Sequence, residues 1–328
     1  MPMTRAHDLM NSSGTAAGKS NAVAPPPKKG FQARKEKWMR SSAANSVAKA
    51  AKIVLFYIIF YTALVGFFAA MLVVFYQTLD PKIPKWQLTS SLIGSNPGLG
   101  FRPMPPESNV ESTLIWYKGN DDKNYKYWTE ELDSFLKVYK NPGLLPGGGQ
   151  NKMTCDYEKP VTPGKVCEVD IKHYYPCTQE NNYNYHKSAP CIFLKLNKIF
   201  GWKPDFYNDT ANLPALMPQD LKTHIETQKN QEPKSKEWMN TVWVSCEGEN
   251  PADTENIGPI QYIPRRGFPG YFFPFMNTDG YLSPIVAVFF ERPVTGVLIN
   301  IECKAWAHNI FHDRMERRGS VHFELMID

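Results

Sequence analysis

Several catalytic signatures are missing from this 328-residue sequence. It has no GxSxG nucleophile elbow, no GxxxxGK[ST] phosphate loop and no HExxH zinc motif. His308 and His312 are four residues apart and are followed by Asp313, a spacing that forms a weak metal site only on a helix. That segment lies between two predicted strands, so we expect no metal site there. Since the catalytic signatures are missing as well, the sequence predicts no catalytic residue, no metal and no cofactor.

Charged residues are also missing from one long stretch, residues 53–79. Residues 1–52 hold ten basic and two acidic residues, whereas residues 80–328 hold 27 basic and 30 acidic residues. The formal charge of +5 therefore comes from the first 52 residues, and the larger remainder is slightly acidic. This distribution argues against nucleic acid as a partner, since nucleic-acid-binding domains carry their positive charge on the folded surface.

The 27 uncharged residues predict a transmembrane helix, because about 20 apolar residues cross a ~30 Å hydrocarbon core. The run is too long and too deep in the chain for a cleavable signal peptide. The alternative is a buried core helix of a soluble protein. The basic excess before the run keeps the N-terminus cytosolic by the positive-inside rule. We therefore expect a single-pass type II membrane protein with a disordered basic cytoplasmic tail (residues 1–52), a transmembrane helix (53–79) and an extracellular domain (80–328).

Aromatic residues recur at helical spacing within the predicted span. Tyr57, Phe60, Tyr61 and Phe68 repeat in this way, and Gly66 and Ala70 form a small-xxx-small pair. Small residues allow a neighbouring helix to approach closely, and a tyrosine hydroxyl inside lipid needs a partner. The alternative is that the two tyrosines belong to the aromatic belt at the membrane surface. Spacing alone leaves both interpretations open.

Cysteine is absent from the first 154 residues, and all six cysteines follow the predicted span. An even number on the oxidising side of a membrane predicts three disulfides, although six cysteines permit fifteen pairings. The absence of CxxC spacing argues against zinc. Cys246 and Cys303 each lie on the apolar side of an alternating pattern, which suits a bridge across a sandwich core.

The segment after the span has mainly β character. Alternating patterns over residues 242–246, 297–303 and 321–327, with the apolar run 285–290, predict strands. One clear helix carries Leu132, Phe135, Leu136 and Tyr139 on one face, with Thr129 as the expected N-cap and residues 141–143 ending it. We predict an immunoglobulin-like β-sandwich with large insertions.

Two further features lie in this segment. Asn208 begins the one N-glycosylation sequon after the span, in a polar and turn-rich stretch. The aromatic segment, defined as Tyr271, Phe272, Phe273, Pro274 and Phe275, precedes the apolar strand. Such a cluster is ordinary in a core, whereas on a surface it is typical of a protein-docking patch.

Together these features resemble the beta subunits of the sodium/potassium-transporting ATPase (the X,K-ATPase beta family), most closely invertebrate members. The likeness extends from about residue 30 to the C-terminus. Its markers, in chain order, are Phe56-Tyr57-Ile58-Ile59-Phe60-Tyr61, Gly98-Leu99-Gly100-Phe101-Arg102-Pro103, Tyr174-Tyr175-Pro176-Cys177, the aromatic segment and Ile301-Glu302-Cys303-Lys304-Ala305-Trp306.

The resemblance implies a non-catalytic subunit that helps the catalytic alpha subunit fold, reach the plasma membrane and remain stable there, and that tunes the potassium affinity of the pump. It also implies consecutive cysteine pairing, which here is Cys155–Cys167, Cys177–Cys191 and Cys246–Cys303. It assigns contact with the alpha subunit to Tyr57, Phe60 and Tyr61 in the span and to the aromatic segment outside it. Relatives often carry several glycosylation sites, whereas this sequence offers Asn208 alone outside the cell.

Other functions fit the same topology. A type II Golgi glycosyltransferase also has a short tail, a span and a luminal domain, but this sequence lacks the DxD spacing and the alternating βα pattern of many such enzymes. Within the same family, the gastric proton-pump subunit shares these motifs, and so does a relative that acts in adhesion or cell junctions through cell–cell contacts of the ectodomain.

Overall fold

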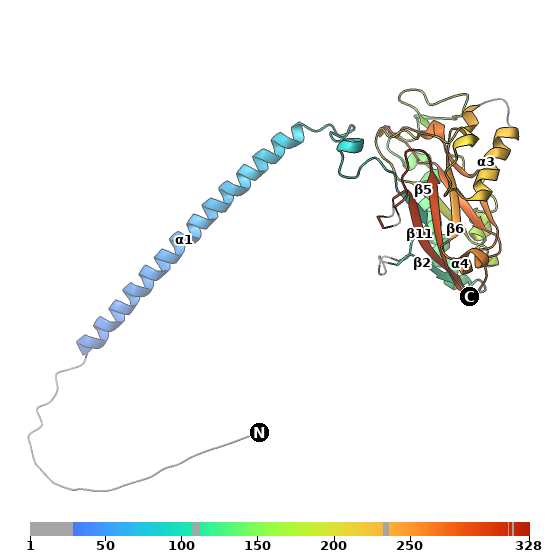
Figure 1. Cartoon of the computed structure of the whole chain (residues 1–328). Coiled ribbons are helices and arrows are strands. Elements are labelled where there is room, and N and C mark those ends of the chain that lie inside the picture. The colour runs from blue at the N-terminus through green and yellow to red at the C-terminus, as the bar shows by residue number, and fades with distance from the viewer. Residues whose placement is uncertain (1–28, 107, 109–111, 232–235, 314, 317) are drawn as a thin grey trace, which may run out of the picture. The chain divides into compact units, whose positions relative to one another are not determined.

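The computed structural model describes residues 29–106, 108, 112–231, 236–313, 315–316 and 318–328. The chain divides into two units, residues 1–78 and residues 79–328. The first unit contains one long helix and the second contains the strands (Figure 1). Each unit is described separately below.

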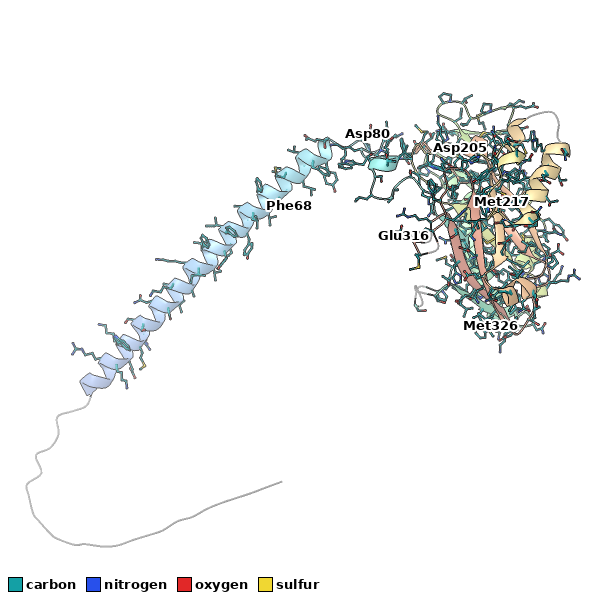
Figure 2. All side chains as sticks on the ribbon, in the orientation of Figure 1. Phe68, Asp80, Asp205, Met217, Glu316 and Met326 are labelled. Atoms are coloured by element: carbon teal, nitrogen blue, oxygen red, sulfur yellow. A yellow bond between two sulfur atoms is a disulfide. The ribbon has the colours of Figure 1, made fainter. Side chains whose placement is uncertain are left out.

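Helix α1 runs from Lys29 to Gln77 without interruption. Its 49 residues span roughly 73 Å at 1.5 Å per residue, more than twice the thickness of a hydrocarbon core. An 18-residue window within it has a mean hydropathy of 2.5, and by length and composition α1 is a candidate membrane span. Every α1 side chain that the structure describes is exposed (Figure 2).

Helix α1 begins well before the predicted span. Residues 29–52, which we expected to be disordered, are helical in the structure. They contain no proline and are rich in alanine, lysine and arginine, all of which have high helix propensity, so the helix continues through them. The predicted disorder of residues 1–28 lies outside the described residues.

The second unit contains two main sheets and a small parallel pair. The four-stranded sheet has the order β1-β5-β9-β7, with β1 at Leu99–Arg102, β5 at Cys191–Leu196, β9 at Ile285–Phe290 and β7 at Ile260–Ile263. The five-stranded sheet has the order β2-β11-β10-β6-β8, with β2 at Leu114–Tyr117, β11 at Ser320–Ile327, β10 at Leu298–Trp306, β6 at Thr241–Gly248 and β8 at Gly267–Pro269. The small pair joins β3 (Lys152–Met153) to β4 (Val166–Cys167).

The two main sheets share one hydrophobic core. The predicted alternation is confirmed in β10 and β11, where buried and partly exposed residues alternate along most of each strand. Phe323 of β11 lies 5.0 Å from Phe101 of β1 and 6.3 Å from Phe290 of β9, measured between ring centroids. These ring contacts connect the five-stranded sheet to the four-stranded sheet, so the two sheets bury their apolar faces against each other.

Helix α2 (Asp122–Lys140) contains the predicted amphipathic face, and Leu132, Leu136 and Tyr139 are buried. The helix ends at the predicted place, with Asn141 as C-cap. Our predicted start was wrong. Asp121 is the N-cap, because its carboxylate accepts a hydrogen bond from the backbone N–H of Lys123 at 3.0 Å, and Thr129 lies inside the helix.

The sequence did not predict two further helices, α3 (Gln219–Gln231) and α4 (Pro251–Asn256). Helix α3 covers the outer face of β6, which explains why all residues from Thr241 to Cys246 are buried instead of alternating. Leu221 and Ile225 of α3 pack with Trp243 and Trp306 in a second, smaller hydrophobic cluster. Short 3-10 turns complete the described elements: Leu88–Ser90, Pro142–Leu144, Gln179–Lys187, Thr210–Asn212, Lys236–Met239 and Gly270–Phe272.

Disulfides join consecutive cysteines: Cys155 to Cys167, Cys177 to Cys191 and Cys246 to Cys303. The expectation that the last pair crosses the sandwich core was wrong. Cys246 and Cys303 face each other on β6 and β10, neighbouring strands of one sheet, with their Cα atoms 4.0 Å apart. An alternating pattern shows which face a cysteine occupies, but it does not show which strand lies beside it.

We expect the Cys246–Cys303 disulfide to contribute most to stability, because it closes the longest loop. Loops with sequence separations of 57 and 12 residues correspond to about 4 and about 3 kcal/mol in the chain-entropy model. The double variant Cys246→Ser/Cys303→Ser should therefore melt at a lower temperature than the matched variant Cys155→Ser/Cys167→Ser. Thermal unfolding under non-reducing conditions tests this order, and equal or reversed melting temperatures would contradict it.

Candidate functional site

The face of α1 that carries Tyr57 and Tyr61 is a candidate contact surface. The two rings stack with their centroids 6.0 Å apart, and their side chains are 50% and 55% exposed. Phe60 lies beside them, with its ring 5.4 Å from that of Tyr61. At about 100° per residue, Phe68 continues the same stripe one helical repeat further on. The stripe is therefore an ordered aromatic surface that this chain itself leaves uncovered.

Gly66 and Ala70 lie on the opposite side of α1. Gly66 is nine residues from Tyr57, which corresponds to a rotation of about 180° around the helix axis. A Cβ atom added at Gly66 would meet no atom within 4 Å, so this position is open in the chain alone. The aromatic stripe and the small-residue pair therefore face different directions, and one straight partner helix cannot contact both.

The aromatic segment is half-buried at the surface of the second unit. Phe272 is buried in the core, whereas Tyr271, Phe273, Pro274 and Phe275 are each partly exposed. The ring of Tyr271 lies 5.1 Å from that of Tyr157, and the ring of Phe273 lies 5.5 Å from that of Trp202. The segment is thus anchored to the core by its inner edges and presents its outer edges to solvent.

An apolar groove of about 380 Å³ borders the aromatic segment. Its lining combines Tyr271, Phe272, Pro274 and Met276 with the loop at residues 161–167. The Cys155–Cys167 disulfide holds that loop, and the Cys167 sulfur lies 3.5 Å from the backbone oxygen of Tyr271. A disulfide therefore fixes the wall opposite the aromatic rings.

A cation lies beside the same segment. The Lys198 ammonium is 5.2 Å from the ring centroids of both Phe275 and Tyr281, which is within cation–π distance. Burial lowers the pKa of the Lys198 ammonium from its ordinary value. This edge of the segment therefore combines apolar rings with a partly desolvated charge.

Residues just after the aromatic segment bind Lys82, near the start of the second unit. The Asn277 side-chain amide donates to the backbone oxygen of Lys82 at 3.1 Å, and the Lys82 ammonium pairs with Asp279 at 3.3 Å. Lys82 is only five residues beyond Gln77, the last residue of α1. The aromatic segment thus lies in the part of the second unit that contacts its first residues.

The Asn208 sequon is accessible. Asn208 and Asp209 are exposed, and Asn208 follows the buried Tyr207. The Lys229 ammonium of α3 donates to the Thr210 hydroxyl at 3.0 Å and lies 3.8 Å from the Asp209 carboxylate. These contacts hold the sequon against the end of α3 while the asparagine side chain faces solvent.

His308 and His312, the pair considered for metal binding, make separate contacts. The His308 ring lies 4.0 Å from the Tyr207 ring, whereas His312 Nε2 lies 2.8 Å from the backbone oxygen of Ala305. Burial lowers the pKa of the His312 imidazole, which favours its neutral form. Within the described residues, no group of three or more His, Cys, Asp and Glu side chains forms a possible metal site.

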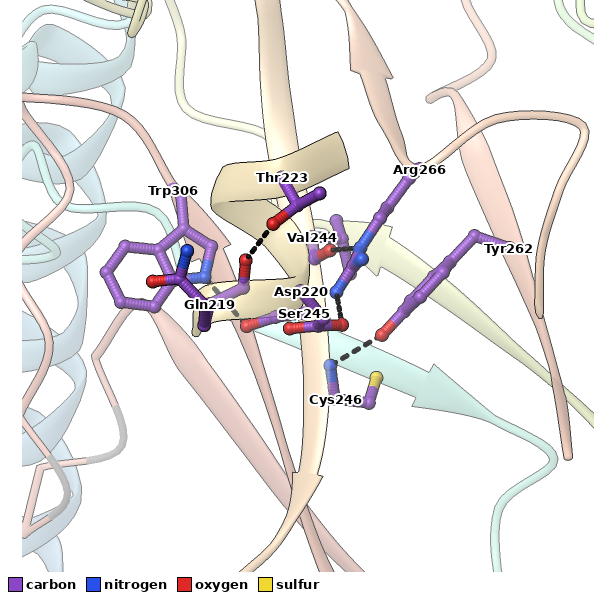
Figure 3. Close-up of polar contacts among 9 residues, drawn as sticks. All are labelled: Gln219, Asp220, Thr223, Val244, Ser245, Cys246, Tyr262, Arg266 and Trp306. Atoms are coloured by element: carbon purple, nitrogen blue, oxygen red, sulfur yellow. Dashed lines mark hydrogen bonds and ion pairs between the residues drawn. The ribbon is translucent and has the colours of Figure 1, made fainter. Parts of the chain in front are cut away.

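Sequence reasoning missed a polar clamp that attaches α3 to the five-stranded sheet (Figure 3). Arg266 is only 9% exposed, and its Nε donates to the backbone oxygen of Val244 at 3.0 Å while its Nη2 donates to Asp220 of α3 at 2.7 Å. The guanidinium also lies 4.6 Å from the ring centroid of Tyr262, whose hydroxyl accepts from the backbone N–H of Cys246. A paired arginine in a loop has no sequence pattern of its own, so periodicity could not reveal it.

We predict that Arg266→Met loosens α3. The variant leaves the buried Val244 carbonyl without its donor, a loss of about 1–3 kcal/mol. Hydrogen exchange of the backbone amides in residues 219–231 should become faster. Asp220→Asn removes the contact with α3 but keeps the Val244 hydrogen bond, and should speed exchange by a smaller amount, because Asp220 is 67% exposed and an exposed ion pair is worth about 1 kcal/mol at most. Unchanged exchange in Arg266→Met would refute the clamp.

Comparisons with known proteins agree with one another. The sequence profile of the family described as sodium/potassium ATPase beta chain matches residues 36–323. The chain is 64% identical over 279 residues to the sodium/potassium-transporting ATPase subunit beta-2 of Drosophila melanogaster, covering 85% of each chain. It is 40% identical to subunit beta-1 of the same organism, over 84% of this chain and 85% of that protein. With human subunit beta-2 it shares 27% identity over 84% of this chain and 86% of the human protein.

Proposed function

This chain belongs to the sodium/potassium ATPase beta chain family, and from that membership we propose that it helps a catalytic alpha subunit to fold, reach the plasma membrane and remain stable there. Beta chains of the pump are non-catalytic plasma-membrane subunits that associate with the alpha subunit, and this chain is likewise an accessory subunit and not an enzyme. The family assignment argues against the glycosyltransferase alternative. Modulation of potassium affinity is part of the same proposal.

The proposed topology is type II, with the N-terminus in the cytosol. Ten of the twelve charged residues before residue 53 are basic. By the positive-inside rule, this excess favours a cytosolic position for the N-terminal side of the span. The cysteines and the Asn208 sequon then lie on the side where disulfides form and glycans are attached. We infer that residues 53–79 span the bilayer, that residues 80–328 are extracellular, and that the two packed sheets are an immunoglobulin-like sandwich with insertions.

The first proposed contact with the alpha subunit is the aromatic stripe of α1, with Tyr57, Phe60 and Tyr61 at its centre. The stripe supports this role because its neighbouring rings form one continuous, exposed aromatic surface on the helix. Tyrosine hydroxyls in hydrocarbon are also stabilised by hydrogen bonds to a neighbouring helix. Gly66 and Ala70 face another direction and are left for lipid or for a second helix.

The second proposed contact is the aromatic segment with its apolar groove, facing an extracellular loop of the alpha subunit. Lys82 is bound to Asn277 and Asp279, and five extended residues span at most about 18 Å. The aromatic segment is therefore connected, through Lys82, to the chain segment that follows the proposed span, and an extracellular loop of a membrane-embedded partner is the contact we propose for it. Partly exposed rings on a disulfide-fixed base are typical of interface anchors.

The family match over residues 36–323 carries the functional proposal, and co-expression tests it. An alpha subunit of the sodium pump should reach the cell surface, measured as ouabain-sensitive ATPase activity, when this chain is present. It should remain in the endoplasmic reticulum when this chain is absent. Equal surface activity with and without the chain would overturn the proposal.

We predict that Tyr57→Ala/Tyr61→Ala weakens association with the alpha subunit. Loss of two interhelical hydroxyl contacts at about 0.6 kcal/mol each corresponds to an affinity reduced about eightfold, before lost packing is counted. Co-purification from mild detergent measures the effect. Ile59→Ala, which removes an apolar side chain from the other side of α1 at a similar depth, is the control. Unchanged recovery of the alpha subunit with the double variant would contradict this contact and would assign the two tyrosines to the aromatic belt at the membrane surface.

A further inference from the structure

A second groove, of about 520 Å³, lies in the second unit between α3, β6 and β7. Helix α3 forms one wall through His224 and Gln228, strand β7 forms the other, and β6 supplies Thr241 and Trp243. The remaining lining residues are Trp238, Ile260, Gln261, Tyr262, Pro264, Arg265 and Arg266. The volume is within the range of small-ligand sites, about 300–1,000 Å³.

Arg265 is held in place by two aromatic rings. The central carbon of its guanidinium lies 5.6 Å from the ring centroid of Tyr157 and 5.2 Å from that of Trp238. Its Nη1 donates to the Tyr157 hydroxyl at 3.2 Å. In the described part of the chain, this is the hydrogen bond recorded for its five N–H donors. A guanidinium binds a carboxylate or a sulfate through two parallel hydrogen bonds.

The charge of the groove is positive. No aspartate or glutamate is among the described residues that line it. Arg266 is already paired with Asp220, whereas no ion pair joins Arg265 to any carboxylate in the described part of the chain. Burial and the nearby Arg266 lower the pKa of the His224 imidazole, so that His224 adds no charge at neutral pH. Arg265 is thus the uncompensated cation of the groove.

The rest of the lining suits a sugar. The groove is lined by the partly exposed indole ring of Trp238, which can pack on the C–H face of a pyranose, and by the Gln228 amide, which can bond to hydroxyl groups. An added peptide strand fits less well, because β7 has only four residues and Pro264 follows it directly. We propose that this groove binds an anionic saccharide, with Arg265 contacting its carboxylate or sulfate group.

The test uses the full-length chain in nanodiscs without an alpha subunit, so that its outcome is independent of the proposed pump role. The probes are sialyllactose for a carboxylate, a heparin-derived tetrasaccharide for a sulfate, and lactose as the uncharged control. Binding is followed by saturation-transfer NMR and by calorimetry. We expect at least one of the charged saccharides to bind and lactose not to bind, and the stronger of the two identifies the anionic group.

Arg265→Gln should weaken that binding about tenfold or more, because a charge-assisted, bidentate contact is lost. Arg318→Gln removes the same charge from an exposed turn and should leave affinity unchanged. Gln228→Ala, on the surface of α3 and favourable for the helix, should weaken binding while it keeps the melting temperature, so the proposal stays testable if Arg265→Gln does not fold.

Several results would overturn the proposal. The first is that neither charged saccharide binds. The second is that Gln228→Ala and a folded Arg265→Gln both bind with the affinity of the wild type. The third is that Arg265→Gln and Arg318→Gln lose the same amount of affinity. Binding of a tetraglutamate peptide in place of the saccharides would also overturn it, and would assign the groove to an acidic protein segment.

Discussion

The apolar surface of α1 is the constraint on which the other features of this chain depend. Every described side chain of the helix is exposed in the chain alone, and each large apolar side chain gains about 1.5–3 kcal/mol when it is removed from water. Lipid can cover most of this surface. Tyrosine hydroxyls and an ordered ring stripe are better covered by a protein helix, which accounts for a subunit that needs a partner.

In the ectodomain, three kinds of contact hold two layers of sheet and an added helix in one arrangement. The shared core, with Phe323 between Phe101 and Phe290, stabilises the sheets. The Cys246–Cys303 disulfide joins neighbouring strands, and Arg266 joins α3 to the same sheet close to that disulfide (Figure 3). A rigid frame of this kind allows surface segments to be held half-buried, which the aromatic segment requires.

The two grooves of the ectodomain differ in chemistry and therefore in the ligands that they suit. The groove beside the aromatic segment is lined mainly by apolar and proline side chains and lies near residues that bind the stalk. The groove beside α3 combines aromatic rings with Arg265 and lacks acids among its described lining residues. The first suits a protein loop, and the second suits a small anionic ligand.

The sequence alone determined the features that depend on local composition and period: the uncharged run in α1, the alternating faces of β10 and β11, the buried face of α2 and the family resemblance. Only the tertiary structure decided which strands are neighbours. It therefore placed the Cys246–Cys303 disulfide within one sheet, covered the outer face of β6 with α3, and brought Arg265 beside the rings of Tyr157 and Trp238. Periodicity reports which side of an element is apolar, whereas contacts between residues far apart in the chain depend on how the elements pack, and no local pattern encodes that.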